Sequence, residues 1–492
     1  MKHALISVYH KEGLETLVSE LHKQGVVLYS TGGTAEYIAS LGIPVELVEE
    51  LTGYPSIFGG RVKTLHPSVF GGILYRRSEE QDIAQASEFS IPSFDMVVVD
   101  LYPFKETLLS GATEQEVIEK IDIGGVSLLR AAAKNFTDVA VVSRPQDYAH
   151  VAQWVREGSL DLNRRKALAA QAFNLTFEYD LMISAFMNGG GVMPLRYGEN
   201  PHQNASFVGN INKLVTTLQG KALSYNNLLD LDAALQLISE FDPNQGCTFA
   251  IIKHNNACGV ATRKQVKDSY LTALASDPLS AFGGILVCNH EIDFETAQEI
   301  DSLFFEILIA PSFAEEALAL FKSKKQRTLL KLNSLELSST QYRSALNGWL
   351  IQDADNQIEK QADFKVVTEK KPTESEVKDL EMALKIVKHT KSNAIVLVKG
   401  GAMLASGTGQ TSRVDALNQS LAKARHFGME VAGAVMASDA FFPFPDCVEI
   451  AAEARITAIV QPGGSIKDAL SIEAANQKEV SMVFSGNRHF KH

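Results

Sequence analysis

Apolar runs and segments of helical periodicity alternate along the first third of the chain. The run 4–8 is followed by Leu14, Leu17, Val18 and Leu21, which lie at the i, i+3, i+4, i+7 spacing of one helix face. Further short apolar runs, each typical of a buried strand, lie at 26–29, 45–48, 96–101 and 140–143. A helix is expected from the loop 30–34 to about Ser40. Strands separated by helices predict a parallel sheet covered on both faces, which is a doubly wound α/β fold.

A run of three glycines divides the chain. Residues 164–187 have the composition of a long helix, and the glycines 189–191 interrupt it. We therefore predict one domain over 1–189 and a second domain over 190–492.

The second domain is again mixed α/β. Its apolar runs predict strands at 248–252, 284–288, 394–398, 435–437 and 457–460, and its helical patterns lie at 230–240, 295–304, 375–390 and 413–427. The polar stretch 322–375 either joins two subdomains or forms an excursion around them. The similar strings SDPLSAFGG and SDAFFPFPD indicate an internal duplication.

Composition argues against several classes of protein. Of the 492 residues, 45% are hydrophobic and 21% are charged, as in ordinary globular domains. The net charge of −12 argues against binding to nucleic acid or to an anionic membrane, because both require a basic surface. No stretch approaches the roughly 18 apolar residues of a membrane span. The four cysteines form no C-x-x-C pair, so we expect reduced thiols and a cytoplasmic protein.

The loop 30–34, with the sequence STGGT, is a candidate phosphate site. Its glycines let the backbone approach an anion closely, its hydroxyls add donors, and the following helix offers the positive end of its dipole. The loop lacks the Gly-Lys-Ser/Thr of a Walker A motif. The competing interpretation is an ordinary strand–turn–helix in which Thr34 is the N-cap.

Charged side chains gather in further stretches of the first domain. Arg61 and Lys63 follow a Gly-Gly turn and are suited to holding a phosphate or an oxyanion, unless they form only a solvated basic loop. Asp100 and Tyr102 end a buried strand, where the functional residues of parallel sheets tend to lie. The remaining candidates for proton transfer here are Asp122 and Lys134.

In the second domain, Lys253 and His254 follow the strand predicted at 248–252. A turn there would bring a cation and a proton acceptor to one site, and the alternative is an ordinary strand-end loop. The aromatic run 441–445 is either core or a flat wall for a ring system, and composition alone favours core. Other polar candidates are Arg196, Tyr197, Asn393 and Arg413. No set of Cys and His has the spacing of a zinc site, so no metal ligands are predicted.

Many separate strings occur in one order along nearly the whole chain: STGGTA, GGRVKTLHP, DLYPF, IDIGGVSLLRAAAKN, LRYGENPHQ, KHNNACGVA, DPLSAFGG, TKSNAIVL, GQTSR, SDAFFPFPD and QPGGS. Together they closely resemble the bifunctional purine-biosynthesis family that joins 5-aminoimidazole-4-carboxamide ribonucleotide (AICAR) formyltransferase to IMP cyclohydrolase. The resemblance implies formyl transfer from 10-formyltetrahydrofolate to AICAR, giving FAICAR. It then implies dehydrative closure of FAICAR to IMP, so that the chain would catalyse the last two steps of de novo IMP synthesis.

For the first domain the resemblance implies a methylglyoxal-synthase-like fold with cyclohydrolase activity. The catalytic positions that match are Lys63, Tyr102, Asp122 and Lys134. The positions that would bind the substrate are Ser7, Ser30, Thr31, Gly32, Gly33, Thr34, Arg61, Thr64, Asp100, Gly124 and Gly125.

For the second domain the resemblance implies a formyltransferase built of cytidine-deaminase-like α/β subdomains without zinc. The matching catalytic positions are Lys253, His254 and Asn393, the nucleotide-binding positions are Arg196, Tyr197, Asn227 and Arg413, and the positions near the folate are Phe441 and Asp446. For the aromatic run 441–445 the resemblance therefore favours a flat surface for a ring system over core packing. The family shares this site between two subunits, which implies a homodimer, and a structural potassium ion near Asp439 stays open. The chain looks somewhat short for the family, and 322–375 carries none of its motifs.

Parts of the sequence are also compatible with two other functions. A nucleotide-binding regulator without catalysis is disfavoured, because Lys63, Lys134, Lys253 and His254 are all present. A phospho-sugar lyase of the methylglyoxal-synthase type would account only for the first part of the chain.

Overall fold

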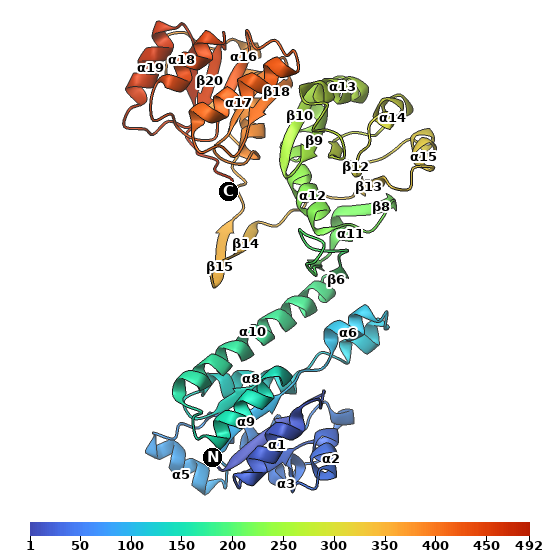
Figure 1. The fold of residues 1–492 in the computed structure, drawn as a ribbon, viewed down its shortest axis with the longest axis vertical. Helices are drawn as coiled ribbons and strands as arrows, with labels where there is room; N and C mark the ends of the chain where they lie inside the picture. Colours follow the sequence, from blue (N-terminus) through green and yellow to red (C-terminus); the bar gives the residue numbers. More distant parts are fainter. The chain divides into compact units, whose positions relative to one another are not determined.

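The computed structural model describes residues 1–492 and divides into two compact units (Figure 1). Unit 1 comprises Met1–Met193 with Val208–Asn210, and unit 2 comprises Pro194–Phe207 with Ile211–His492. The predicted boundary after residue 189 falls just before this division. Two short strands, β6 (Gly191–Pro194) and β7 (Ser206–Gly209), pair at the transition. None of the helices combines the length and apolar character that a membrane span needs.

Unit 1 contains a five-stranded parallel sheet in the order β3-β2-β1-β4-β5. Its strands are β1 (His3–Ser7), β2 (Val27–Ser30), β3 (Glu46–Leu47), β4 (Phe94–Val99) and β5 (Ala140–Val142). The central strands β1 and β4 expose neither face, which is why they read as continuous apolar runs. The predicted doubly wound α/β fold is confirmed.

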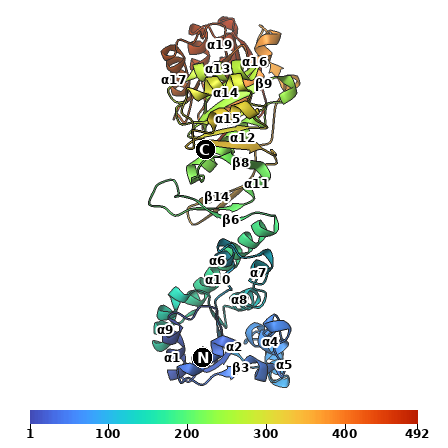
Figure 2. The ribbon, with the colours of Figure 1, turned by 90° about the vertical axis from the view of Figure 1, so that its right-hand side faces the viewer.

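Helices surround this sheet, and α1 and α9 pack side by side (Figure 2). The helices of unit 1 are α1 (Leu14–Lys23), α2 (Gly32–Ser40), α3 (Val48–Thr52), α4 (Pro67–Leu74), α5 (Glu80–Glu88), α6 (Phe104–Leu109), α7 (Glu114–Ile118), α8 (Gly124–Lys134), α9 (Tyr148–Arg156) and α10 (Leu162–Met187), with 3₁₀ turns at Phe58–Gly60 and Pro145–Asp147.

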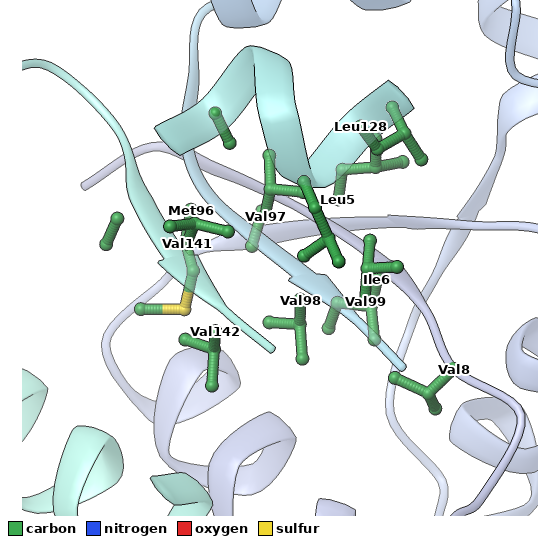
Figure 3. Packing of buried hydrophobic residues seen from close by; sticks show 14 of the residues in the cluster. Leu5, Ile6, Val8, Met96, Val97, Val98, Val99, Leu128, Val141 and Val142 are labelled. Carbon is green, nitrogen blue, oxygen red and sulfur yellow. The ribbon is translucent and has the colours of Figure 1, made fainter. Parts of the chain in front are cut away.

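The core of unit 1 shows the alternation expected of strands. Leu5 and Val97 point toward Leu128 of α8, whereas Val98 and Val142 point to the opposite face (Figure 3). All five side chains are at most 1% exposed. This packing fixes where the carboxyl ends of β1 and β4 lie.

Unit 2 contains one continuous twelve-stranded sheet in the order β16-β21-β20-β19-β17-β18-β10-β9-β11-β12-β13-β8. Its strands are β8 (Val215–Gln219), β9 (Cys247–Lys253), β10 (Asn256–Arg263), β11 (Ile285–Cys288), β12 (Ile307–Ala310), β13 (Thr328–Leu332), β16 (Lys365–Val366), β17 (Ile395–Lys399), β18 (Ala402–Gly407), β19 (Val435–Ser438), β20 (Ala458–Gln461) and β21 (Ser481–Phe484).

The sheet of unit 2 consists of two equivalent halves. In β9–β13 and again in β17–β21, the first strand is antiparallel to the second and the third, while the third, fourth and fifth are parallel. The halves meet edge to edge at β10 and β18. The internal duplication is therefore real, but the two strings that suggested it are not equivalent, because SDPLSAFGG precedes β11 and SDAFFPFPD follows β19.

The helices of unit 2 cover both faces of the sheet. They are α11 (Ile211–Leu214), α12 (Tyr225–Ile238), α13 (Val266–Ser276), α14 (Phe294–Asp301), α15 (Glu315–Phe321), α16 (Glu374–Lys388), α17 (Arg413–His426), α18 (Asp446–Glu453) and α19 (Asp468–Gln477). Helices α12 and α16 share one core that runs across both halves. The opposite face has two separate cores, one for each half. The predicted two α/β subdomains thus share one sheet.

The polar stretch 322–375 both joins the halves and leaves the sheet. It contributes β13 to the first half and β16 to the edge of the second. Between these strands, β14 (Thr340–Ala345) and β15 (Gly348–Asp353) form a separate hairpin that projects from its unit (Figure 1). Several large apolar residues of this hairpin are exposed: Tyr342, Leu346, Trp349, Leu350 and Ile351.

Candidate active sites

A cavity of about 630 Å³ lies at the carboxyl ends of β1, β2 and β4 in unit 1. Ser7 ends β1, Thr31 follows β2 and Asp100 follows β4, so strand topology alone brings these distant residues together. The predicted residues that line the cavity are Ser7, Thr31, Gly33, Thr34, Arg61, Lys63, Thr64, Asp100, Tyr102, Asp122, Gly124 and Gly125.

Two helix N-termini, those of α2 and α8, border this cavity. Thr31 is the N-cap of α2 but makes no side-chain cap bond, and its Oγ1 lies 3.5 Å from Oγ of Ser7. Thr34 is not the N-cap, since its hydroxyl instead donates to O of Val8 at 2.8 Å and accepts from N of Val8 at 3.2 Å. Free backbone N–H groups at a helix start favour an anion, and a phosphate fits this arrangement.

An acid and a phenol face the same cavity. Oδ1 of Asp122 accepts a hydrogen bond from N of Gly125 at 2.7 Å, yet burial raises the pKa of this carboxyl. Burial and the nearby Asp122 raise the pKa of Tyr102. The loop that carries Asp122 is fixed by Tyr179 of α10, whose hydroxyl donates to O of Lys120 and accepts from N of Asp122. The site thus holds a carboxyl and a phenol whose pKa values are both raised, and both groups are of the type that transfers protons.

Among the lining residues that sequence reasoning missed, four have polar side chains: Tyr9, Lys11, Glu119 and Lys120. Burial lowers the pKa of Lys11, and the ammonium of Lys120 lies 5.4 Å from the ring centre of Tyr9. Lys11 could have been found, because it follows the first parallel strand as Asp100 follows the fourth. Four cationic side chains face three carboxylates here, so the pocket favours an anion although the chain is acidic.

Three predicted residues of unit 1 do not line the cavity. Lys134 is an exposed residue at the last position of α8, about 15 Å along the helix from Gly124 at the cavity. Ser30 is buried and donates to O of Ile6 at 2.7 Å. Gly32 begins α2 without facing the cavity. The Asp100 and Arg61 side chains do line it but are already paired, with His10 at 2.7 Å and with Glu119.

In unit 2, Lys253 ends β9 and His254 begins the two-residue turn into β10. Nζ of Lys253 donates to the carbonyl oxygens of Phe282 and Gly283 at 2.9 and 3.1 Å. Oδ1 of Asp230 on α12 accepts from N of Asn255 in the turn at 2.7 Å. The predicted turn is present, and the imidazole of His254 is exposed on it.

One asparagine connects this turn to the second half. Nδ2 of Asn256 donates to O of His254 at 2.8 Å, and its Oδ1 accepts from N of Lys391 at 2.9 Å. Two residues further on, Nδ2 of Asn393 donates to O of Gln410 at 3.0 Å. The structure therefore brings Asn393 to the same end of the strands as Lys253 and His254.

Arg413, the first residue of α17, lies at the same end of the sheet beside Asp439. Its Nη2 lies 3.3 Å from Oδ1 of Asp439, and its guanidinium lies 5.6 Å from the ring centre of Phe490. Asp439 is fully buried, its Oδ2 has no hydrogen-bond partner, and burial raises the pKa of this carboxyl.

The aromatic run divides between the two interpretations. Phe442 is fully buried, whereas Phe441 and Phe444 are 37% and 50% exposed. Asp446 begins α18 and accepts from N of Cys447. No hydrogen bond or ion pair joins Phe441 or Asp446 to the Lys253–His254 turn.

Apart from Arg413, which begins α17, the predicted nucleotide residues lie around the start of α12. Asn227 forms a capping box with Ser224 at the N-terminus of this helix. The neighbouring Asn226 donates to O of Glu199 at 3.1 Å, which fixes the loop that contains Arg196 and Tyr197. The guanidinium of Arg196 lies 5.4 Å from the Tyr197 ring centre. Asn227 and Asp230 lie three residues apart on one helix face.

Comparison with known proteins gives matches along both units. A family profile described as "AICARFT/IMPCHase bienzyme" matches residues 132–423, and one described as "MGS-like domain" matches residues 13–127. Proteins named "Bifunctional purine biosynthesis protein PurH" are similar over their full length. The one from Bacteroides thetaiotaomicron is 52% identical over 100% of this chain and 99% of its own length. Those from Aquifex aeolicus and Ruminiclostridium cellulolyticum are 46% and 44% identical, over 99% and 100% of this chain and 100% of their own lengths. The matches run over 504, 510 and 519 residues, more than the 492 of this chain, which agrees with a chain somewhat short for the family.

Proposed function

We propose a division of labour between the two units of this chain, which belongs to the AICARFT/IMPCHase bienzyme family. The chain is a bifunctional transferase and hydrolase of the last two steps of de novo IMP synthesis. We assign ring closure to the cavity of unit 1. We assign formyl transfer to the end of the unit 2 sheet that carries Lys253 and His254.

Ring closure requires the carboxamide nitrogen of FAICAR to attack the formyl carbon, followed by loss of water. The N-termini of α2 and α8 would bind the 5′-phosphate. Lys63 and Tyr102 would stabilise the oxyanion that forms on the formyl oxygen, and Asp122 would orient the carboxamide and exchange its proton. The raised pKa of Asp122 supports a proton-sharing role. We assign no step to Lys134, because it lies at the other end of α8.

Formyl transfer requires the 5-amino group of AICAR to attack the formyl carbon of 10-formyltetrahydrofolate. His254 would take the amine proton, and the tetrahedral intermediate would collapse with cleavage of its bond to N10 of the folate. Lys253, held by two carbonyl groups, would stabilise the oxyanion or protonate the departing N10. Asn393 would position the formyl group, Arg196, Tyr197, Asn227 and Arg413 would bind the nucleotide, and Phe441 and Asp446 would lie near the folate.

The observation that carries the assignment is the cavity of unit 1, which gathers a phosphate-type anion site and three proton-transfer or oxyanion groups. The test is one coupled assay in which AICAR and 10-formyltetrahydrofolate are supplied and FAICAR and IMP are separated by chromatography. We expect His254→Ala to abolish FAICAR formation while supplied FAICAR still closes at nearly the normal rate. We expect Lys63→Ala to convert AICAR into accumulating FAICAR. A parallel fall of both rates in either variant would contradict two separate sites.

We further propose a homodimer in the cytoplasm. The exposed apolar side chains of the β14–β15 hairpin support association, because exposed apolar clusters mark interaction surfaces. The four cysteines are all free and buried, which suits a reducing compartment.

We also propose a structural potassium ion near Asp439. The buried Oδ2 of Asp439 lacks a hydrogen-bond partner, so an oxygen ligand is present there, and Ser392 lies beside it. Such an ion would supply positive charge to a buried carboxylate that Arg413 neutralises only in part. No cluster of His, Cys, Asp and Glu in the chain has the make-up of a site for other metals.

A further inference from the structure

The duplicated halves of unit 2 offer an internal comparison for the turn that carries His254. In each half a helix with an N-terminal capping box precedes the first strand, namely α12 with Ser224 and α16 with Thr373. The sixth residue of each helix is an aspartate, Asp230 in α12 and Asp379 in α16. The two aspartates therefore occupy equivalent places in the two halves.

Each aspartate holds the hairpin turn that follows its first strand. Oδ1 of Asp230 accepts from N of Asn255 at 2.7 Å. Oδ2 and Oδ1 of Asp379 accept from N of Gly400 and N of Gly401 at 2.6 and 2.7 Å. Binding the turn is thus a property of the duplicated fold.

The two turns share a backbone conformation but differ in sequence. Both residues of each turn have positive φ, which is 51° and 63° for His254 and Asn255 and 57° and 70° for Gly400 and Gly401. Glycine adopts this region freely, whereas a side chain such as that of histidine disfavours it. A histidine kept in this conformation, where the equivalent residue is glycine, indicates that its side chain is needed there.

The surroundings of the two turns also differ. Lys253 and Lys399 each end the first strand of their half and donate to carbonyl groups just before the third strand, Lys399 to O of Ala432 at 2.7 Å. In the second half, however, Nη1 of Arg263 donates to O of Gly400 at 3.0 Å and O of Gly401 at 2.9 Å. A guanidinium thus binds both carbonyl groups of that turn, whereas no side chain of this kind binds the carbonyl groups of the His254 turn.

We propose that Asp230 is a positioning residue for formyl transfer, which holds the Asn255 N–H and thereby fixes the turn that presents His254. This inference rests on the proposed role of His254. Asp379 performs the same structural task for a turn without a catalytic side chain, so it serves as a matched control within the same chain.

The test compares Asp230→Ala, Asp230→Asn and Asp379→Ala in the full-length protein. For each variant kcat and KM(AICAR) of formyl transfer, closure of supplied FAICAR and thermal unfolding are measured.

We expect Asp230→Ala to lower kcat of formyl transfer about 10- to 100-fold with KM little changed, since small displacements of a catalytic group have effects of this size. Asp230→Asn should restore most of kcat, because its amide oxygen can accept the Asn255 N–H. Asp379→Ala should reduce thermal stability at least as much while kcat stays within about 3-fold, the range of an indirect effect.

Each contrary result has a defined meaning. Equal loss of kcat in Asp230→Ala and Asp379→Ala, or an Asp230→Asn variant as slow as Asp230→Ala, would overturn the positioning role. An unchanged kcat in Asp230→Ala beside an inactive His254→Ala would overturn this inference alone, whereas an active His254→Ala would overturn the proposed function. If Asp230→Ala does not fold, Asp230→Glu replaces it, because the longer side chain displaces the carboxylate and should lower kcat in the same way.

Discussion

Gly259 illustrates how much a single residue can decide in this fold. It lies in β10, and a Cβ at this position would lie 1.9 Å from the backbone oxygen of Ala273 in α13. A backbone atom cannot move aside as the end of a side chain can. The close approach of helix and strand behind the His254 turn therefore depends on the absence of a side chain here.

We expect Gly259→Ala to destabilise unit 2 by about 3 kcal/mol, the upper end of the range typical of overpacking in a core, because the contact is with backbone. The matched control is Gly348→Ala in the exposed hairpin, where a Cβ would meet nothing within 4 Å and stability should change by less than about 0.5 kcal/mol. Urea unfolding followed by circular dichroism measures both. Equal stability of the two variants would contradict the contact.

At the residue scale, the sequence predicted only part of the cavity lining of unit 1. Lys63, Tyr102 and Asp122 line one cavity as expected, because loops at the carboxyl ends of parallel strands converge. Lys134 was placed with them by motif alone, although the rise along α8 carries it away from the cavity. Lys120 was missed because nothing in its local sequence shows that Tyr9 and Tyr102 lie within cation–π distance.

At the scale of elements, the C-terminal segment is held by a buried imidazole. His489 is 2% exposed, with Nδ1 2.7 Å from Oδ2 of Asp355 and Nε2 2.9 Å from Oε2 of Glu359. Burial alone would lower the pKa of His489, but its two carboxylate partners outweigh this and raise the pKa to about 9. The same segment accepts a hydrogen bond from N of Ser392, the residue before Asn393, through O of Lys491.

The raised pKa of His489 predicts that the stability of the fold decreases as pH rises. A group whose pKa is higher in the folded than in the unfolded state stabilises the fold fully below its unfolded value, here near 6.5. That stability is lost as pH rises toward 9, and we expect the loss to be roughly 3 kcal/mol. The pKa values of Asp355 and Glu359 are lowered, so their contribution disappears only in acid.

Urea unfolding at pH 6.5, 7.5 and 9 would measure this contribution. The control is His489→Gln, which keeps a polar side chain but cannot be charged, so its stability should be lower at pH 6.5 and should change less toward pH 9. An identical pH dependence in wild type and variant would show that the imidazole does not carry the effect.

Elements were predictable where their periodicity was strong. Most strands with Val, Ile and Leu were found within two residues of their bounds, as were the helices at 375–390 and 413–427. Strands β8, β10, β12, β13 and β21 were not predicted. Strand β18 was also missed, because its residues AMLASG have low strand propensity and owe their pairing to β10 and β17. The duplication of unit 2 was predicted from two strings that are not equivalent, because the equivalence is clearest in the order of the strands.

At the scale of the whole molecule, the β14–β15 hairpin bears on association. Its residues are nearly all exposed, although Tyr342 and Ile351 form an apolar cross-strand pair. We expect Tyr342→Glu combined with Ile351→Lys to shift the proposed dimer toward monomer by removing apolar contact area. Formyl transfer should fall with the dimer, while closure of supplied FAICAR should persist.

Light scattering over a dilution series measures the state of association, and both activities are assayed at each concentration. Gln341→Lys, in the same hairpin but at a polar cross-strand pair with Gln352, is the control and should remain dimeric. A wild-type monomer with full formyl transfer would refute the proposed shared site.

The seam between the half-sheets has a consequence for synthesis of the chain. Strand β10 is complete at Arg263, but its outer neighbour β18 begins only at Ala402. Roughly 140 residues, or about 10 to 30 s of translation, separate the two on the ribosome. During that interval the nascent first half presents an open, apolar strand edge, which is the feature most prone to mispairing with other chains. Newly made chains, rather than the finished enzyme, should therefore be the form that most depends on chaperones.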